Sequence, residues 1–345
     1  MRSGRYAPMS GPAEPLSLSG SLPNLRLNTA QSLVNPDSAP TITTSAPGSL
    51  MLLGEHAVLH GKRALVCAIN RRITVRLSRS SESSVRIVSN LGNYRSPLGD
   101  LVDHPSFRFV LQGIKQHRDR IPSGFELRID SEFSADIGFG SSAAVTVATH
   151  AALMQWTNNK APEHKELFSQ SLETVCAVQG RGSGADLAAS VFGGIVAYST
   201  APEFHRLPVS LPLTAVYCGY KIPTLEVIRK VEQLRTADPD EHERIYSEMD
   251  LSVEEAVAAL KGNDLPLFGL VLDRNQQLMD KLGVNTPELQ EIVTALQYAP
   301  NISGAKISGS GMGDCAVGIG HAELNGLGYS VYHLEITPEG FECHE

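Results

Sequence analysis

The pattern of apolar and polar positions predicts an α+β chain in which strands and helices mix throughout. Short alternating or continuous apolar runs are typical of strands, and longer apolar runs with helical spacing are typical of helices. The strands are predicted at residues 41–44, 50–53, 64–69, 73–77, 85–88, 125–129, 194–198, 214–219, 305–307, 315–319 and 330–336. The helices are predicted at residues 107–117, 143–156, 166–179, 224–235, 239–260, 264–282 and 288–297. Because these elements do not follow a strict βαβ repeat, the pattern favours α+β over α/β.

The pattern also predicts where the first strand is interrupted, how the meander continues and which strand is the last. Residues 45–48 contain a proline and a glycine, so they are predicted to break the first strand into two. Residues 85–88 are predicted to continue the meander of the preceding strands. Residues 330–336 are predicted to be the last strand of the chain.

The length and the composition predict two domains after an N-terminal tail. At roughly 150 residues per domain, the 345 residues suffice for about two domains. Proline and polar residues cluster at 201–212, so we place an N-terminal domain at 41–206 and a C-terminal domain at 207–345. In residues 1–40, 16 residues are Pro, Ser or Gly, which predicts a disordered tail. A transit peptide is the alternative for this segment.

The charge and the cysteines exclude several classes of function. The 29 basic and 37 acidic residues give a net charge of −8, which argues against a nucleic-acid partner because phosphate neutralisation needs a basic surface. No apolar run approaches the roughly 18 residues that a membrane span needs. The five cysteines are widely spaced without a CxxC pair, which indicates reduced thiols in the cytoplasm. We therefore expect a cytoplasmic protein with a small-molecule substrate, and a homodimer stays open.

Residues 138–144 form the sharpest motif, Gly-Phe-Gly-Ser-Ser-Ala-Ala directly before a predicted helix. Glycines let backbone N–H groups converge on one point, and the helix N-terminus adds the positive end of its dipole. Such a loop could cradle a polyphosphate, and serine hydroxyl groups could contact phosphate or Mg²⁺. The alternative is a plain helix N-cap whose glycines allow close packing. The candidate ligand contacts are Gly138, Gly140, Ser141, Ser142 and Ala143.

Two further glycine-rich segments carry candidate chemistry. Asp186 follows a glycine turn at 180–184, so its carboxylate could reach into a cleft and orient a hydroxyl group. The alternative role for Asp186 is the N-cap of a helix at 187–191. Residues 304–314 join two short strands, and the backbone N–H groups of such a loop can face phosphates. The alternative for this segment is a plain glycine-rich hairpin.

In this order, the three segments resemble the motifs of the GHMP kinase superfamily, and residues 45–61 resemble its first motif. The resemblance runs from about residue 41 to the C-terminus. It implies an N-terminal domain like ribosomal protein S5 domain 2 and a ferredoxin-like C-terminal domain. It also implies ATP and Mg²⁺ as cofactors, with Ser142 near the metal and with Gly309 and Gly311 closing over the nucleotide. Asp186 would then face the hydroxyl group of the acceptor.

Several segments resemble the mevalonate kinase branch of this superfamily. Glu55 and His56 resemble the segment that lies near the substrate there. Lys221 and Thr224 resemble a Lys-x-x-Thr segment, so Thr224 is predicted to donate a hydrogen bond to Asp186. This branch implies a kinase that phosphorylates the primary hydroxyl group of mevalonate in isoprenoid precursor synthesis. The catalytic residues would be Asp186, Thr224 and Lys221.

Other segments resemble the phosphomevalonate kinase branch. Residues 179–186 are similar to that branch, with Ser183 and Gly184 as candidate substrate contacts, and so are residues 313–315. Arg71 and Arg72 would suit a phosphorylated acceptor. Phosphomevalonate is therefore the alternative acceptor, and a sugar or another small alcohol is a further one.

Two positions depart from the superfamily pattern. Ser49 stands where most mevalonate and phosphomevalonate kinases carry lysine, and Val175 stands where the resemblance places a Mg²⁺-binding glutamate. The nearest substitutes by motif context are Lys221, His56 and Asp136. These departures keep open an alternative from a different class, a nucleotide- or metabolite-binding relative with weak or no phosphoryl transfer.

Overall fold

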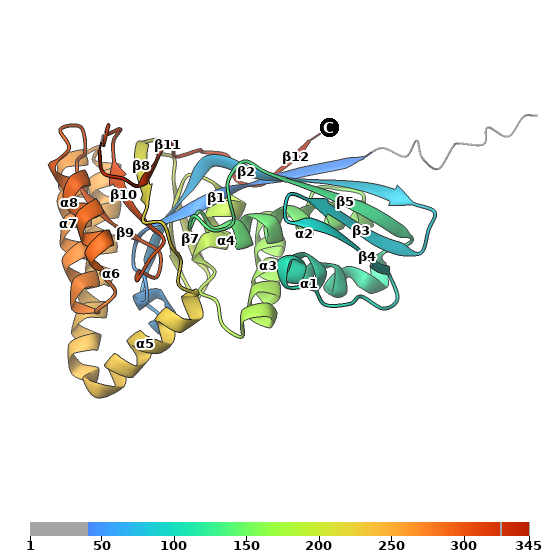
Figure 1. The fold of residues 1–345 in the computed structure, drawn as a ribbon, viewed down its shortest axis with the longest axis horizontal. Helices are drawn as coiled ribbons and strands as arrows, with labels where there is room; N and C mark the ends of the chain where they lie inside the picture. Colours follow the sequence, from blue (N-terminus) through green and yellow to red (C-terminus); the bar gives the residue numbers. More distant parts are fainter. Residues whose placement is uncertain (1–40, 325, 345) are drawn as a thin grey trace, which may run out of the picture. The chain divides into compact units, whose positions relative to one another are not determined.

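Two β-sheets and two groups of helices make up the computed structural model, which describes residues 41–324 and 326–344 (Figure 1). The strands of the first sheet are β1 Ile42–Leu53, β2 Ala64–Ser80, β3 Ser84–Ser89, β4 Gly92–Pro97, β5 Gly124–Ser131, β6 Ile195–Ser199, β7 Glu203–Leu207 and β12 Glu342–His344. Their order is β12-β1-β2-β5-β3-β4, and β6 pairs with both β2 and β7. Neighbouring strands are antiparallel except for the parallel pair β3 and β5.

β1 continues through the residues that were expected to interrupt it, so the prediction of two separate strands is wrong. Pro47 pairs with Arg72 on β2, and the register shifts before Ser49. This β-bulge accommodates a residue without an N–H group. A Cβ atom on Gly48 would lie 2.7 Å from the carbonyl oxygen of Phe139, so only glycine fits there. The bulge therefore brings β1 against the first glycine-rich loop, where the N–H of Ser49 donates to that carbonyl over 3.1 Å.

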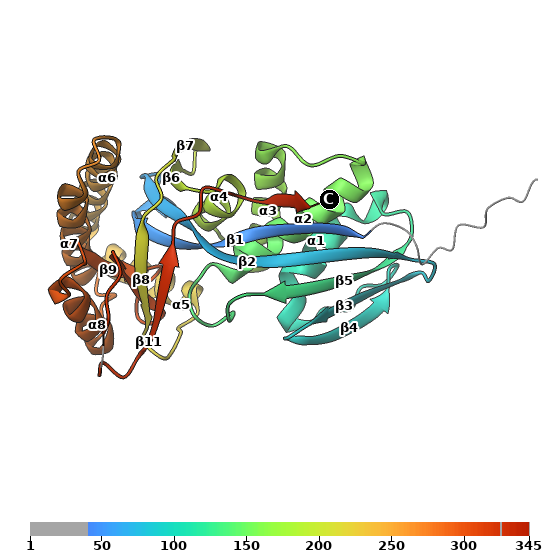
Figure 2. The same cartoon turned by 90° about the horizontal axis from the view of Figure 1, so that it is seen from above.

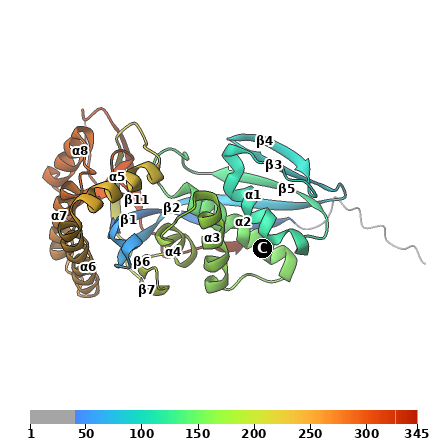
Figure 3. The same cartoon turned by 90° about the horizontal axis from the view of Figure 1, so that it is seen from below.

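Four helices cover one face of the first sheet: α1 Arg108–His117, α2 Ser141–Asn158, α3 His164–Gln179 and α4 Ala185–Phe192 (Figures 1 and 3). α2 packs against β1 and β2 and contacts the other three helices. Its residues Ala144, Ala148 and Ala151 are fully buried. Small side chains at these positions let the helix approach the sheet closely. The N-terminus of α2 is thereby fixed next to the bulge in β1.

The second sheet contains β8 Pro212–Tyr217, β9 Ala305–Ser308, β10 Cys315–Ile319 and β11 Ser330–Glu335. Its antiparallel order, β11-β8-β10-β9, places the first and third of these strands at the centre, as the ferredoxin-like prediction requires. Between β8 and β9 the chain forms α5 Thr224–Ala237, α6 Pro239–Lys261, α7 Leu265–Lys281 and α8 Pro287–Tyr298. α7 and α8 pack against β9, and α6 packs against α7 (Figure 2). Asp238, Asp264 and Thr286 cap α6, α7 and α8, each accepting a backbone N–H bond beside a proline in the first turn.

Three strands were not expected from the sequence: β4, β7 and β12. β4 has buried residues only at Tyr94 and Ser96, β7 has one buried residue, and β12 is only three residues long, so their sequences give no alternating apolar signal. β12 follows β11 and pairs with β1, so the prediction that 330–336 is the last strand is wrong. β3 also does not continue the meander from β2, because β2 already pairs with β1, β5 and β6. Alternation predicts which residues form a strand, but it does not predict the partner of that strand.

The mixture of strands and helices confirms the α+β class. Within the described residues, no helix is both long enough and apolar enough to cross a membrane. All five cysteines are free thiols. Residues 1–40, predicted to be a disordered tail, lie outside the described residues, and the domain division at residue 206 stays a prediction.

Candidate functional site

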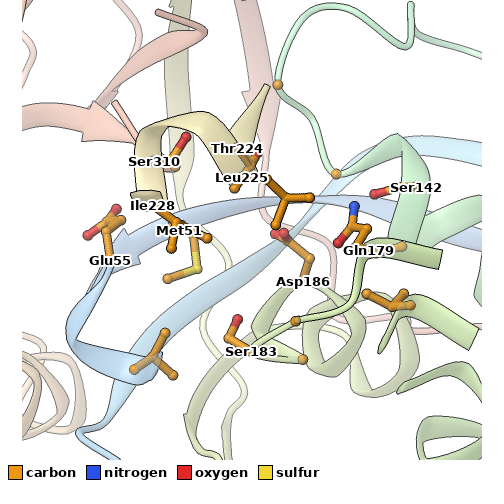
Figure 4. Close-up of a pocket in the computed structure, with 18 of the residues that line it drawn as sticks. Met51, Glu55, Ser142, Gln179, Ser183, Asp186, Thr224, Leu225, Ile228 and Ser310 are labelled. Atoms are coloured by element: carbon orange, nitrogen blue, oxygen red, sulfur yellow. The ribbon is translucent and has the colours of Figure 1, made fainter. Parts of the chain in front are cut away.

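The three glycine-rich segments and the end of β1 line one pocket (Figure 4). The pocket walls also include the start of α5 and the C-terminal part of α3. The predicted site residues that line it are Glu55, His56, Gly138, Gly140, Ser141, Ser142, Ala143, Ser183, Gly184, Asp186, Lys221, Thr224 and Gly309. The structure therefore brings together most of the residues that the sequence analysis selected.

The loop before α2 is shaped to present backbone N–H groups to the pocket. Gly138 and Gly140 have φ values of +72° and +65°, in the left-handed region that favours glycine. A Cβ atom on Gly140 would lie 2.0 Å from Ser49 Oγ. α2 begins at Ser141, so the N–H groups of its first turn have no carbonyl partner within the helix. Together with the Ser141 and Ser142 hydroxyl groups and the helix dipole, they offer donors to an anion.

Asp186 presents a carboxylate to the pocket from the first turn of α4. The Ser49 hydroxyl group donates to Asp186 Oδ1 over 2.8 Å. Desolvation by the pocket walls raises the pKa of the Asp186 carboxyl group, although Ser49 and the charge of Lys221 act in the opposite direction. A carboxyl group held in this way can orient a hydroxyl group and accept its proton.

The predicted hydrogen bond from Thr224 to Asp186 is not formed among the described residues. Thr224 begins α5 and lines the same pocket (Figure 4), but the side-chain donor to Asp186 is Ser49 on β1. From the sequence, Ser49 is notable only as the position of a missing lysine. In the structure, its hydroxyl group is the direct neighbour of the carboxylate.

Lys221 and Asp314 form an ion pair at the pocket, with 3.3 Å between Lys221 Nζ and Asp314 Oδ1. Burial raises the pKa of the Asp314 carboxyl group, and the charge of Lys221 lowers it. Asp314 was not among the predicted site residues, because the glycines of this segment were expected to carry its chemistry. A lone carboxylate within a run of glycines was the signal that could have identified it.

Glu55 and His56 connect the end of β1 to the third glycine-rich segment. Glu55 forms a buried ion pair with Lys306 of β9. His56 Nε2 lies 2.9 Å from the carbonyl oxygen of Ser310, and burial lowers the pKa of its imidazole. A neutral imidazole therefore donates this bond to the loop. Lys306 was missed because a lysine in a short strand is usually exposed.

Several expected residues lie outside the pocket. Gly311 packs against Val284, whose carbonyl oxygen would lie 2.7 Å from a Cβ atom, and Gly311 is not among the lining residues. Arg72 pairs with strand β12, and neither Arg71 nor Arg72 lines the pocket. The expectation that these two arginines suit a phosphorylated acceptor is therefore wrong. Asp136 is exposed and also lies outside the pocket lining, which excludes it as a substitute there.

The oxygen donors of the pocket fit a magnesium ion that is held largely by the phosphates of a bound nucleotide. Val175 lines the pocket and brings no carboxylate. The described part of the chain has no group of three or more His, Cys, Asp or Glu side chains that could hold a metal. The pocket does contain the hydroxyl oxygen of Ser142 and the carboxylate of Asp186. Mg²⁺ prefers such oxygen ligands, and it commonly uses one or two carboxylates together with substrate phosphates.

Known proteins resemble this chain over most of its length. Residues 107–194 match the GHMP kinases N terminal domain, residues 256–325 match the GHMP kinases C terminal, and residues 35–79 match the galactokinase galactose-binding signature. The mevalonate kinase of Archaeoglobus fulgidus is 35% identical over 278 residues, which is 80% of this chain and 91% of that protein. The mevalonate kinase of Pyrococcus furiosus is 30% identical over 295 residues, with 79% and 87% covered.

Solved structures share the fold. The Lin0012 protein from Listeria innocua superposes with a TM-score of 0.79 at 20% identity, covering 89% of this chain and all of that one. The Methanococcus jannaschii mevalonate kinase superposes with a TM-score of 0.74 at 24% identity, covering 87% and 99%. These matches support the two-domain architecture that the resemblance implied.

Proposed function

We propose that this chain, which belongs to the mevalonate kinase family of the GHMP kinases, transfers the γ-phosphoryl group of ATP to the primary hydroxyl group of mevalonate. The observation that carries the proposal is the position of Asp186. Its carboxylate shares one pocket with the glycine-rich loop at the N-terminus of α2. This arrangement pairs a proton acceptor with an anion-binding helix end, which are the two parts that transfer to an alcohol needs.

In the proposed mechanism, Asp186 orients the acceptor hydroxyl group and accepts its proton. The hydroxyl oxygen forms a bond to the γ-phosphorus, and the bond from that phosphorus to the bridging oxygen of ADP breaks. The N–H groups at the start of α2 balance the negative charge of the phosphates. Ser49 holds the carboxylate through the 2.8 Å hydrogen bond, and Lys221 adds positive charge beside it.

Mg²⁺ is part of the proposal, with Ser142 as its protein ligand, so that the Asp186 carboxylate stays free to accept the proton. When bound, the ion neutralises phosphate charge. Val175 removes one expected ligand, so we expect the ion to bind weakly without nucleotide. Titration of the protein with Mn²⁺, with and without ADP, measures this difference.

The charges of the pocket favour mevalonate over phosphomevalonate. Among the described lining residues, the lysine and arginine side chains are Arg181 and Lys221. Lys221 faces Asp314, and Arg181 lies 3.8 Å from Glu232, so the pocket has little uncompensated positive charge for an anionic acceptor. Mevalonate brings one carboxylate, whereas phosphomevalonate adds a phosphate group. We also propose a cytoplasmic location and a homodimer. Light scattering on the purified protein tests the homodimer, and fractionation of cells tests the location.

Release of ADP tests the proposal, with ATP, Mg²⁺ and a panel of mevalonate, phosphomevalonate and several sugars. We expect turnover with mevalonate, and we expect Asp186→Asn to lower kcat by about 10²–10⁴-fold. Asp240→Asn, an exposed change at the start of α6, is the matched control. Near-normal turnover by a folded Asp186→Asn variant would refute the role of Asp186. Preference for phosphomevalonate, or nucleotide binding without any turnover, would refute the assigned activity.

A further inference from the structure

Asp314 combines two features that disfavour folding unless another interaction offsets them. Its φ value is +66°, in the left-handed region that non-glycine residues seldom adopt, although Asp and Asn enter it more readily than others. Its side chain is nearly buried, and Oδ1 has no hydrogen-bond partner that meets normal geometry among the described residues. The nearest positive charge is the Lys221 ammonium group at 3.3 Å. A buried carboxylate oxygen without a hydrogen-bond partner, beside a pocket, points to a functional role.

Asp314 is held between two parts of the pocket. Its N–H donates to the carbonyl of Tyr220 over 3.0 Å, and its carbonyl accepts from the N–H of Cys218 over 2.9 Å. Both contacts lie on the segment that leads to Lys221. On the other side, the carboxyl group lies against Gly138, where a Cβ atom would be 3.1 Å from Asp314 Oδ1. Asp314 therefore connects the first glycine-rich loop to the segment that carries the lysine.

We infer that Asp314 is a positioning residue that holds the Lys221 ammonium group where it meets the γ-phosphate of ATP. A lysine side chain that is about one-third exposed has many accessible rotamers, and one fixed acceptor selects among them. Lys221 supplies this positive charge from the segment that precedes α5. The inference rests on the proposed function only in that the ligand is a nucleoside triphosphate.

The energetic link between the two residues is tested by nucleotide binding without acceptor. Calorimetry with Mg²⁺ measures the affinities for a non-hydrolysable ATP analogue and for ADP. The proteins are the wild type, Lys221→Met, Asp314→Asn and the double variant, with the exposed Asp136→Asn as a matched control. Asparagine tolerates the left-handed region, so Asp314→Asn removes the charge and keeps the turn. We expect Lys221→Met to weaken analogue binding about tenfold relative to ADP, because a charge-assisted contact is lost.

The affinity of the double variant shows whether Asp314 acts through Lys221 or independently of it. If Asp314 acts through Lys221, Asp314→Asn shows part of the same loss, and the double variant binds no more weakly than Lys221→Met. Independent losses that multiply in the double variant would overturn the inference, and so would an equal effect on ADP and the analogue. Asp314→Gly separates positioning from folding, because glycine adopts this φ freely and removes the buried carboxylate. We expect its Tm to stay the same or rise while the analogue preference falls; a lower Tm with unchanged preference would also overturn the inference.

The inference and the proposed function can fail separately. If mevalonate is not turned over but the binding cycle behaves as described, the proposed acceptor is refuted and the role of Asp314 stands. If mevalonate is turned over but the two losses multiply, the role of Asp314 is refuted and the proposed function stands.

Discussion

A buried chain of hydrogen bonds between α1, α2 and α3 predicts that the protein loses stability in mild acid. Thr174 donates to Gln116 Oε1 over 2.5 Å, so His150 Nε2 must donate to Thr174 over 2.8 Å. His150 Nδ1 is then the acceptor for His117 Nε2 at 2.9 Å, and Arg120 donates to His117 Nδ1 over 3.0 Å. Each imidazole carries one proton, and a second proton would break a hydrogen bond in this chain.

The size of the effect follows from the shifted pKa values. Burial, aided by the charge of Arg120, lowers the pKa of His117 from 6.5 to about 4, and burial lowers the pKa of His150 to about 3. The unfolded chain therefore binds more protons below pH 6.5, and stability falls as the pH falls towards these values. At pH 5, which is about 1.5 units below the pKa of an imidazole in the unfolded chain, each ring lowers the free energy of unfolding by about 2 kcal/mol. The two rings together lower the free energy of unfolding by about 4 kcal/mol relative to pH 7.5.

Urea unfolding at pH 7.5 and pH 5, followed by circular dichroism, measures this loss. His150→Gln removes one of the two titrating rings and keeps an N–H donor for Thr174, so the loss should shrink by about 2 kcal/mol. His205→Gln replaces an exposed imidazole on β7 and should leave the loss unchanged. An equal loss in the wild type and in His150→Gln would refute the reasoning.

Three further predictions concern the pocket. Gly140→Ala places a Cβ atom against Ser49 at φ +65°, so we expect loss of nucleotide binding and about 1–3 kcal/mol of stability. The control Gly99→Ala lies outside the pocket lining, where the nearest atom would be Arg118 Nη2 at 3.5 Å, and should keep both; calorimetry and thermal unfolding check the two variants. Glu55→Gln leaves the buried ammonium group of Lys306 uncompensated, so chemical denaturation should show that the free energy of unfolding falls by about 3–5 kcal/mol. A fall below about 1 kcal/mol would contradict a buried ion pair. Ser49→Ala removes a hydrogen bond that lowers the pKa of Asp186, so the acid limb of the kcat/KM profile should move to higher pH; an unmoved limb would show that Ser49 does not tune this carboxyl group.

The features that could be predicted from the sequence are those encoded within a few residues. Gly138 and Gly140 adopt positive φ values as a phosphate-binding loop requires, because the steric effect of a Cβ atom is local. The prolines and capping residues before α6, α7 and α8 act over a single turn, and these helices begin within one residue of the predicted positions. Asp186 was selected for the same reason, since a glycine turn immediately precedes it.

The features that could not be predicted depend on residues that are distant in the chain. Ser49 and Asp186 are 137 positions apart, and Glu55 and Lys306 are 251 positions apart. No local pattern connects such residues, so the hydrogen bond to Asp186 was assigned to Thr224 and the buried ion pair was missed. The β-bulge in β1 belongs to the same class, because its partner strand decides whether a proline interrupts a strand or is accommodated.

The pairing of β12 with β1 has a consequence for how the chain is made. Ser45 contacts His344, which the ribosome adds 299 positions later. At about 5–20 residues per second, β1 waits about 15–60 s before its outer partner is synthesised. During that time, one edge of the strand that carries Ser49 offers unpaired backbone groups to any neighbouring strand. Translation is therefore the stage at which two copies of this enzyme can most readily pair strand to strand.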